Sequence, residues 1–491
     1  MKKLSALILI IFIILTISCS SDNPKHEITS ENLLKTVAYL ASNELNGRFS
    51  GSKEYYVAAN YMANEFKDLG LKPFENDSYL QKFYVEYNEV LPGAKLNMYK
   101  NGILEKEYKL GDHYVFRGFT GAGDIKADVV FAGYGISIPE YNDYKNIDVK
   151  GKIVLVFKYN PKWKIDGVSF PSGLPREKAR VALEHGAIGI MFVSFPNDEN
   201  PQQTIGSVMH GEGEQVDIPQ IHIDLPVADD FFEGSKFTLK EIQTSIDESK
   251  KANSFKLNSS AEIVVKTNYI KEKETVNVIG VYPGSDAMLK DEFVILGAHL
   301  DHVGGQGGEI YFPGANDNAS GSAAVLEIAR MFAKNKLVTK RSVMFVLFAS
   351  EESGLEGAYH LADNLGVDST KITAMLNMDC IAHGDSIRLG SGKSSPKLWG
   401  LAKSIDKENA KLSIENTWAN GGADATPFHK KGIPTLYFVT TNSYTHLHCI
   451  SDTPETLNPK LYEEITKLAF GVTNKVAKGE YVREELVKLI N

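Results

Sequence analysis

Hydrophobic and polar positions change their spacing along the chain, and this spacing predicts three regions. Between residues 31 and 71, apolar residues recur at helical intervals, which predicts amphipathic helices. The segment 79–90 alternates apolar and polar side chains and therefore predicts a strand. From about 92 to 258, short apolar runs alternate with turns that contain glycine and proline, which is typical of short β-strands.

From about residue 259 the pattern changes to strands, loops and helices in alternation. The expected strands are nearly continuous apolar runs, as found where a sheet is covered on both faces. These runs are EFVILGAH, RSVMFVLFAS, ITAMLNMD and IPTLYFVT. Segments with helical spacing lie between them. The alternation predicts an α/β fold, a three-layer sandwich with a mixed, largely parallel central sheet.

The change of pattern also predicts the domain organisation. Residues 31–91 and 259–491 are expected to form one α/β domain, and residues 92–258 a mostly-β module inserted into it. A polar, turn-rich stretch at 20–30 predicts a tether. A chain of 491 residues is long enough for each part to bury its own core.

Residues 1–19 have the features of a targeting segment. The sequence MKKLSALILIIFIILTISC contains two lysines, an apolar run from Leu4 to Ile17, and then Cys19. The run is short for a membrane-spanning helix, and its flanks are typical of a signal peptide. A cysteine after the apolar core resembles a bacterial lipoprotein signal, in which Cys19 becomes the acylated N-terminus. An ordinary cleaved signal is the alternative, and either one predicts export, with acylation adding an anchor in the bacterial cell envelope.

Composition and charge exclude one class of function. The net charge is −9, and no basic stretch alternates with aromatic residues. We therefore expect no nucleic-acid partner. The apolar content of 43% is ordinary for a globular protein and indicates no particular substrate.

Acidic residues and histidines collect where the predicted strands end. Because the carboxyl ends of strands in an open α/β sheet converge on one crevice, we expect these side chains to meet. Singly, each has an ordinary explanation, such as a helix cap or a solvated acid. Together they offer mixed nitrogen and oxygen ligands, which are typical of zinc, and two histidines with three carboxylates are typical of two ions sharing a bridge. The residues are His299, Asp301, Asp317, Glu351, Glu352, Asp379 and His448.

Five strings around these residues resemble a known family. GAHLDH, GANDNASG, ASEESGLEG, LNMD and HCISDT, in this order, are similar to the co-catalytic zinc aminopeptidases of the bacterial leucyl aminopeptidase type. The resemblance covers 259–491 and extends to LASNELNGRFSGSKEYYVAANYMANEFKDLGLKP near the N-terminus. In the insert, FAGYGI, YNDYKNIDVKGKIVLV and EKARVALEHGAIGIMF resemble a protease-associated (PA) domain. The resemblance implies a secreted zinc aminopeptidase that acts on peptides, with a PA insertion.

The resemblance also implies which residues bind metal. Asp317 would be the carboxylate that bridges two zinc ions. His299 and Asp379 would complete one site, and Glu352 and His448 the other.

Further residues match supporting positions in this family. Glu351 matches the general base, and Asp301 matches the acid that orients a ligand imidazole. Adjacent residues at a strand end point to different sides, so Glu352 can hold metal while Glu351 faces the bound water. Asp452, four residues after His448, matches a similar supporting position.

The region around the last proposed ligand departs from the family pattern. Leu447 stands where relatives often carry a tyrosine that stabilises the oxyanion, and Tyr444 or His446 is the candidate substitute. His446 is also a rival of His448 as metal ligand. His302 matches no position of the pattern.

Several other positions stay open. Alanines flank Asp424 where relatives have serine and histidine, which leaves a substrate-side role of Asp424 undecided. Cys380 and Cys449 each follow a proposed ligand, and a disulfide and two separate buried thiols are both compatible with the sequence. His210 and His222 in the insert are expected to be surface-loop histidines.

Other functions are compatible with the same family. A carboxypeptidase or a dipeptidase is the main enzymatic alternative. Glutaminyl cyclases of this family use one zinc, so a complete two-metal ligand set argues against that branch. A non-enzymatic, receptor-like binding protein is a different class, but the transferrin receptors that represent it have lost the ligands. Residue preference and oligomeric state are left open by the sequence.

Overall fold

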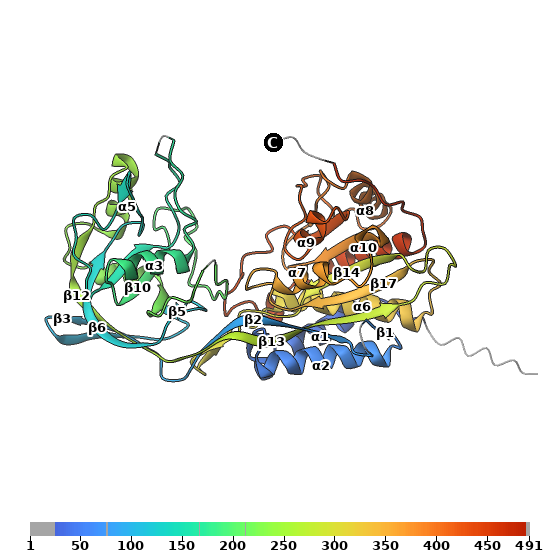
Figure 1. Ribbon diagram of the computed structural model, residues 1–491, viewed down its shortest axis with the longest axis horizontal. Helices are drawn as coiled ribbons and strands as arrows, with labels where there is room; N and C mark the ends of the chain where they lie inside the picture. The colour runs from blue at the N-terminus through green and yellow to red at the C-terminus, as the bar shows by residue number, and fades with distance from the viewer. Residues whose placement is uncertain (1–24, 75–76, 166, 212, 488–491) are drawn as a thin grey trace, which may run out of the picture.

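The computed structural model shows two lobes, each built around one sheet (Figure 1). It describes residues 25–487 apart from 75–76, 166 and 212. The predicted signal peptide, with Cys19, therefore lies outside the described residues. Within the described ranges, no helix is both long enough and apolar enough to cross a membrane.

The first lobe contains a ten-stranded mixed sheet. Four central strands, β17, β14, β18 and β20, run parallel, and their neighbours β13 and β19 pair antiparallel with them. The order across the sheet is β16 (Ile310–Tyr311), β15 (Gly305–Gln306), β2 (Leu80–Val90), β13 (Thr267–Tyr282), β17 (Ser342–Phe348), β14 (Phe293–His299), β18 (Ile372–Met378), β20 (Thr435–Thr440) and β19 (Ile387–Gly390), with β1 (Lys72–Pro73) beside β13. The predicted mixed sheet is confirmed, and its parallel part is the centre.

Helices cover both faces of this sheet, which gives three layers. One face packs against α1 (Ser30–Leu40), α2 (Lys53–Asp68), α6 (Ser320–Lys334), α8 (Pro396–Glu408) and α10 (Pro459–Ala477). The other face packs against α7 (Glu356–Asp363) and α9 (Ala425–Lys430). Burial on both faces explains why β14, β17, β18 and β20 are apolar along their length.

The second lobe contains an eight-stranded sheet. Its order is β4 (Ile103–Tyr108), β3 (Lys95–Lys100), β12 (Phe255–Val265), β6 (Gly123–Phe131), β9 (Ile153–Phe157), β10 (Gly189–Val193), β11 (Gln220–Ile223) and β5 (Tyr114–Phe116). Helix α3 (Pro175–Glu184) packs on one face, and α4 (Leu225–Phe232) and α5 (Leu239–Ser249) pack on the other. A short hairpin, β7 (Ser137–Ile138) with β8 (Tyr141–Asn142), lies apart from the sheet.

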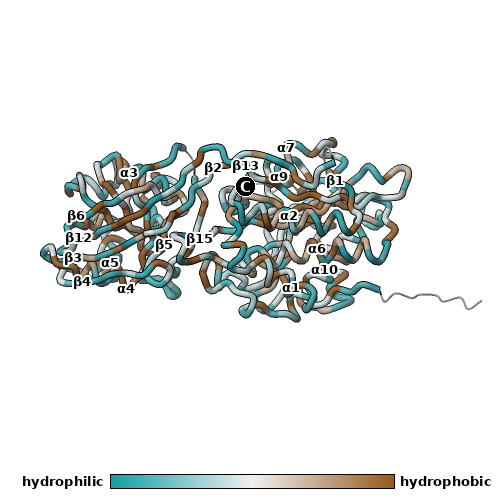
Figure 2. The backbone as a smooth tube through the Cα atoms, turned by 90° about the horizontal axis from the view of Figure 1, so that it is seen from below, coloured by the Kyte–Doolittle hydropathy of each residue, from teal (hydrophilic) through white to brown (hydrophobic). Residues whose placement is uncertain are grey.

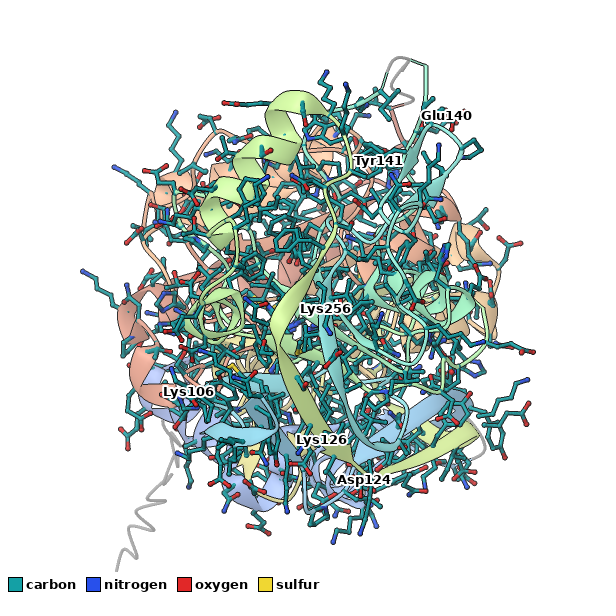
Figure 3. The ribbon with its side chains drawn as sticks, turned by 90° about the vertical axis from the view of Figure 1, so that its left-hand side faces the viewer. Lys106, Asp124, Lys126, Glu140, Tyr141 and Lys256 are labelled. Carbon is teal, nitrogen blue, oxygen red and sulfur yellow. The ribbon has the colours of Figure 1, made fainter. Side chains whose placement is uncertain are left out.

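Long antiparallel strands join the two lobes. Strand β13 pairs with β2 along most of its length; β2 leads from the first lobe toward the second, and β13 returns in the opposite direction (Figure 1). Apolar residues lie within each lobe, and polar residues lie along the outer turns (Figure 2). At the outer end of the second lobe, seen in Figure 3, Lys256 pairs with Asp128 at 2.6 Å and Lys126 lies over the ring of Tyr99. Both lysines therefore have a partner within the second lobe.

Candidate metal centre

The residues proposed from the sequence lie at the carboxyl ends of the central parallel strands. His299 is the last residue of β14, and Asp379 follows β18 directly. Glu352 lies in the loop after β17, and His448 in the loop after β20. Asp317 lies in the short segment Ala315–Ala319 that leads into α6. Four strands and one helix start thus bring them to one edge of the sheet.

One group of ligand atoms forms around His299. Its Nε2 lies 3.2 Å from Asp317 Oδ1 and 3.4 Å from Asp379 Oδ1. All three residues are buried. The phenol of Tyr437 donates a hydrogen bond to the other oxygen of Asp379, Oδ2, while Oδ1 has no hydrogen-bond partner in the described chain.

A second group forms around His448. Its Nε2 lies 3.1 Å from Asp317 Oδ2 and 2.9 Å from Glu352 Oε2. Asp317 therefore turns one carboxylate oxygen toward each group. This is the arrangement that a bridging ligand requires.

The spacing of these atoms fits zinc. Ligands about 2.0–2.1 Å from a tetrahedral zinc ion are about 3.3 Å from one another. The four separations, from 2.9 to 3.4 Å, lie near that value. Imidazole nitrogens and carboxylate oxygens are ordinary zinc ligands, and the buried Asp379 Oδ1 is an acceptor that a cation would satisfy.

Glu351 lies beside the first group. One of its oxygens lies within 4.8 Å of a ligand atom of His299 and of Asp379. Burial raises the pKa of Glu351 well above its usual value, and the neighbouring carboxylate of Glu352 raises it further, while His299 opposes the shift. A carboxyl group with a raised pKa beside a metal centre is suited to accept and return a proton.

Asp301 and Asp452 accept hydrogen bonds from backbone amides next to the proposed ligands. The Nδ1 of His299 faces the carbonyl oxygen of Asp301 at 3.1 Å, whereas the Asp301 carboxylate is 3.8 Å away and accepts from the Glu351 amide at 3.2 Å. Burial raises the pKa of Asp301 to about 7. The Asp452 carboxylate accepts from the Asp317 amide at 3.0 Å and from the preceding amide, so it fixes the loop of Asp317.

His446 does not face this centre. Its Nδ1 lies 2.9 Å from Ser451 Oγ, and its ring packs against His383. Of the two candidate histidines in this loop, the structure brings only His448 to the other site residues.

Comparisons with known proteins follow the two lobes. Residues 277–473 match the family profile of peptidase family M28, and residues 125–231 match that of the PA domain. The chain belongs to peptidase family M28, with an inserted PA domain. The M28 match contains all five residues proposed as metal ligands, and the PA match lies within the second lobe.

Relatives of this M28 protein include named peptidases. It is 25% identical over 209 residues to a probable leucine aminopeptidase of Trichophyton verrucosum, an alignment that covers 41% of this chain and 57% of the relative. The chain thus spans less than two thirds of that protein's length. It is 23% identical over 376 residues to aminopeptidase YwaD of Bacillus subtilis, covering 72% of this chain and 70% of the relative.

A solved structure has the same fold. A zinc aminopeptidase from Bacillus subtilis superposes with a TM-score of 0.62 at 18% sequence identity, covering 93% of this chain and 97% of that one. The agreement extends over both lobes, so the two-lobed arrangement is shared.

The M28 centre contains two residues to which the sequence assigned no role. His302 Nδ1 lies 2.7 Å from Glu352 Oε1, and His302 is fully buried. Asp424 is also fully buried, and neither of its carboxylate oxygens has a hydrogen-bond partner within the described ranges. Burial raises the pKa of Asp424 well above its usual value, with His299 opposing the shift. The position of His302 inside GAHLDH was the available signal.

Arg48, in the LNGR string of the N-terminal segment, also supports the centre. It is fully buried, and its guanidinium donates to the carbonyls of Leu300 at 2.9 Å, Pro313 at 2.9 Å and Gly314 at 3.0 Å, and also to that of Leu40. Burial lowers the pKa of Arg48 to about 10. Three of its four carbonyl partners lie next to His299 or in the segment that leads to Asp317, so Arg48 holds two of the segments that carry proposed ligands.

The remaining sequence expectations have mixed outcomes. Cys380 and Cys449 are both buried free thiols, so the disulfide alternative is excluded. The expectation for His222 was wrong, because it lies buried within β11 and pairs with Ser194. His210 lies between the lobes, with Nε2 2.7 Å from Glu356 Oε1.

Proposed function

We propose that this protein is a zinc-dependent aminopeptidase that removes N-terminal residues from peptides. The observation that carries the proposal is Asp317, whose two oxygens face different histidines, each of which also faces one further carboxylate. In this proposal, His299 and Asp379 hold one zinc, Glu352 and His448 hold the other, and Asp317 bridges them. The printed names of the relatives, aminopeptidases and a zinc aminopeptidase, support the same activity.

Zinc bound at this centre would supply a Lewis acid that polarises the substrate carbonyl and lowers the pKa of a water molecule toward about 7. Glu351 takes the proton of the attacking water and delivers it to the leaving amine. Such proton transfer typically contributes roughly 10²–10⁴-fold to the rate. Asp301 holds the Glu351 backbone through the amide contact at 3.2 Å and so fixes where the base stands.

The free amine of the substrate provides the test for an aminopeptidase. Buried carboxylates around the centre, including Asp424, would receive that positive charge. Leucine p-nitroanilide should be cleaved, and its N-acetyl form should react at least about tenfold more slowly. This ratio corresponds to the roughly 1–3 kcal/mol expected for each buried group left without its partner.

The same assay separates the alternatives. Equal rates on both substrates would exclude aminopeptidase action while leaving a metal-dependent hydrolase. A requirement for a free C-terminal carboxylate would instead indicate a carboxypeptidase, and cleavage of dipeptides alone would indicate a dipeptidase.

We also propose that Cys19 is acylated and anchors the exported protein to the bacterial cell envelope. The support is the lysine-flanked apolar run that precedes this cysteine. Cys19→Ser should remove labelling by a fatty-acid probe and release the protein from the membrane fraction. A wild-type protein that takes up no label would indicate an ordinary cleaved signal peptide.

A further inference from the structure

His302 contacts both residues proposed for one of the two metal sites. Its Nδ1 lies 2.7 Å from Glu352 Oε1, and its ring packs edge-on against His448 with centroids 5.5 Å apart. The same Nδ1 is 4.0 Å from the bridging Asp317 Oδ2. No comparable contact joins His302 to His299 or Asp379 in the described residues.

The hydrogen bond between His302 and Glu352 has one possible direction. A glutamate that serves as a metal ligand is ionised, and a carboxylate only accepts hydrogen bonds. His302 must then donate from Nδ1, which leaves a lone pair on Nε2. That atom is buried and has no hydrogen-bond partner in the described chain, as expected for a neutral ring.

The contact is too short for two ligands of one ion. Ligand atoms on a tetrahedral zinc lie about 3.3 Å apart, whereas Nδ1 and Oε1 are separated by 2.7 Å. The contact also uses Oε1, while the other oxygen of Glu352, Oε2, faces His448 at 2.9 Å. His302 therefore occupies one oxygen of Glu352 and leaves the other for metal.

The backbone fixes the ring in this position. The amide of His302 donates to the carbonyl of Arg48 at 3.2 Å. A side chain at Gly314 would collide with the ring, because a Cβ built there lies 2.5 Å from His302 Cδ2. The ring thus fills a closely bounded space and has little freedom to leave Glu352.

We propose that His302 is a positioning residue for the zinc held by Glu352 and His448, and that it makes this site tight without binding the ion itself. The inference rests on the proposed function, because it requires two bound zinc ions. Partners that orient a metal ligand typically change metal affinity by about 10–100-fold. The counterpart in the other site is Tyr437, which donates to Asp379 Oδ2.

The test compares His302→Asn with His302→Leu. The two side chains have similar shapes, but the asparagine amide can donate where Nδ1 stands and leucine cannot. Zinc dissociation constants are measured by chelator competition, and thermal unfolding of the metal-free proteins checks that both variants fold. His302→Leu should retain one tight ion and bind the second about 10–100-fold more weakly. His302→Asn should recover most of that loss.

Double variants identify which ion is affected. His302→Leu added to Glu352→Ala should cause no further loss of affinity, because both act on the same ion. Added to Asp379→Ala, it should remove the tight binding that remains. Tyr437→Phe is the matched control and should weaken the other ion.

Each alternative outcome has a separate meaning. Equal losses in His302→Asn and His302→Leu would overturn the positioning role in favour of packing or direct ligation. Native affinity for two ions in His302→Leu would also overturn it. A wild-type protein that binds fewer than two zinc ions would instead contradict the proposed function.

Discussion

The two lobes both bury carboxylates, but they satisfy them differently. In the second lobe, Asp143 is buried and accepts hydrogen bonds from the amides of Tyr134 at 3.0 Å and Ile136 at 3.1 Å, and from the phenol of Tyr141 at 2.9 Å. Each oxygen therefore has a donor from the chain itself. This carboxylate is complete without a ligand and holds the turn before β7.

In the first lobe, the buried carboxylates of the centre lack such donors. Asp379 Oδ1, Asp301 Oδ2 and both oxygens of Asp424 have no hydrogen-bond partner among the described residues. Several carboxyl groups also lie close together, and ionising all of them is unfavourable unless cations balance their charge. The comparison shows that burial alone does not identify a site, whereas buried acids without donors do.

The largest effect should come from the residue shared by both groups. Asp317→Asn should lower zinc content from about two ions to below one per chain, because each ion loses a charged ligand. Activity should fall to the assay background. Elemental analysis after zinc reconstitution measures the content, and an Asp317→Asn protein that keeps two ions would contradict the bridge.

A smaller but still large effect is expected at Glu351. Glu351→Gln should reduce kcat by roughly 10²–10⁴-fold while both ions stay bound, because proton transfer alone is lost. Glu352→Gln should instead weaken zinc binding. If both variants bind zinc normally and only Glu352→Gln is inactive, the two roles are reversed.

The smallest effect on activity is expected in the second lobe. Burial raises the pKa of Asp143 to about 7, so the folded protein binds a proton at this position that the unfolded chain releases near pH 4. Stability from this group is therefore lost as pH rises from about 4 to 7. Asp143→Asn removes this dependence and should leave zinc content and kcat unchanged.

Unfolding at several pH values measures this difference. The free energy of unfolding of the wild type should fall relative to that of Asp143→Asn by roughly 1.4 kcal/mol per pH unit between those limits. Trp163 fluorescence reports on this lobe, because its ring lies 5.6 Å from that of Tyr141. A constant difference across the range would show that Asp143 is ionised throughout.

The sequence predicts those residues of the centre that lie at the end of a strand or directly after it. His299, Asp379 and the glutamates after β17 are detectable because a buried parallel strand stops beside them. The partnership of His302 with Glu352 is not detectable in this way, because 50 residues separate the two and the contact depends on how two loops meet.

The sequence also leaves open or mispredicts other positions because they depend on contacts between distant parts of the chain. Cys380 and Cys449 follow ligands in separate loops, and their sequence positions contain no information about the distance between the sulfur atoms. His222 lies in a short strand, QIHI, whose neighbours on both sides bury it. In each case the tertiary neighbour decides the outcome, and that neighbour is distant in sequence.

The contact of Arg48 has a consequence for the order in which the protein is made. Arg48 Nε and its acceptor on Leu300 are 252 residues apart, and the whole PA domain lies between them in the chain. During synthesis, α1 and α2 therefore emerge long before β13, β14 and α6, against which their apolar faces pack. Until then those faces have no partner, so the nascent N-terminal segment is the part of the chain most dependent on protection from aggregation.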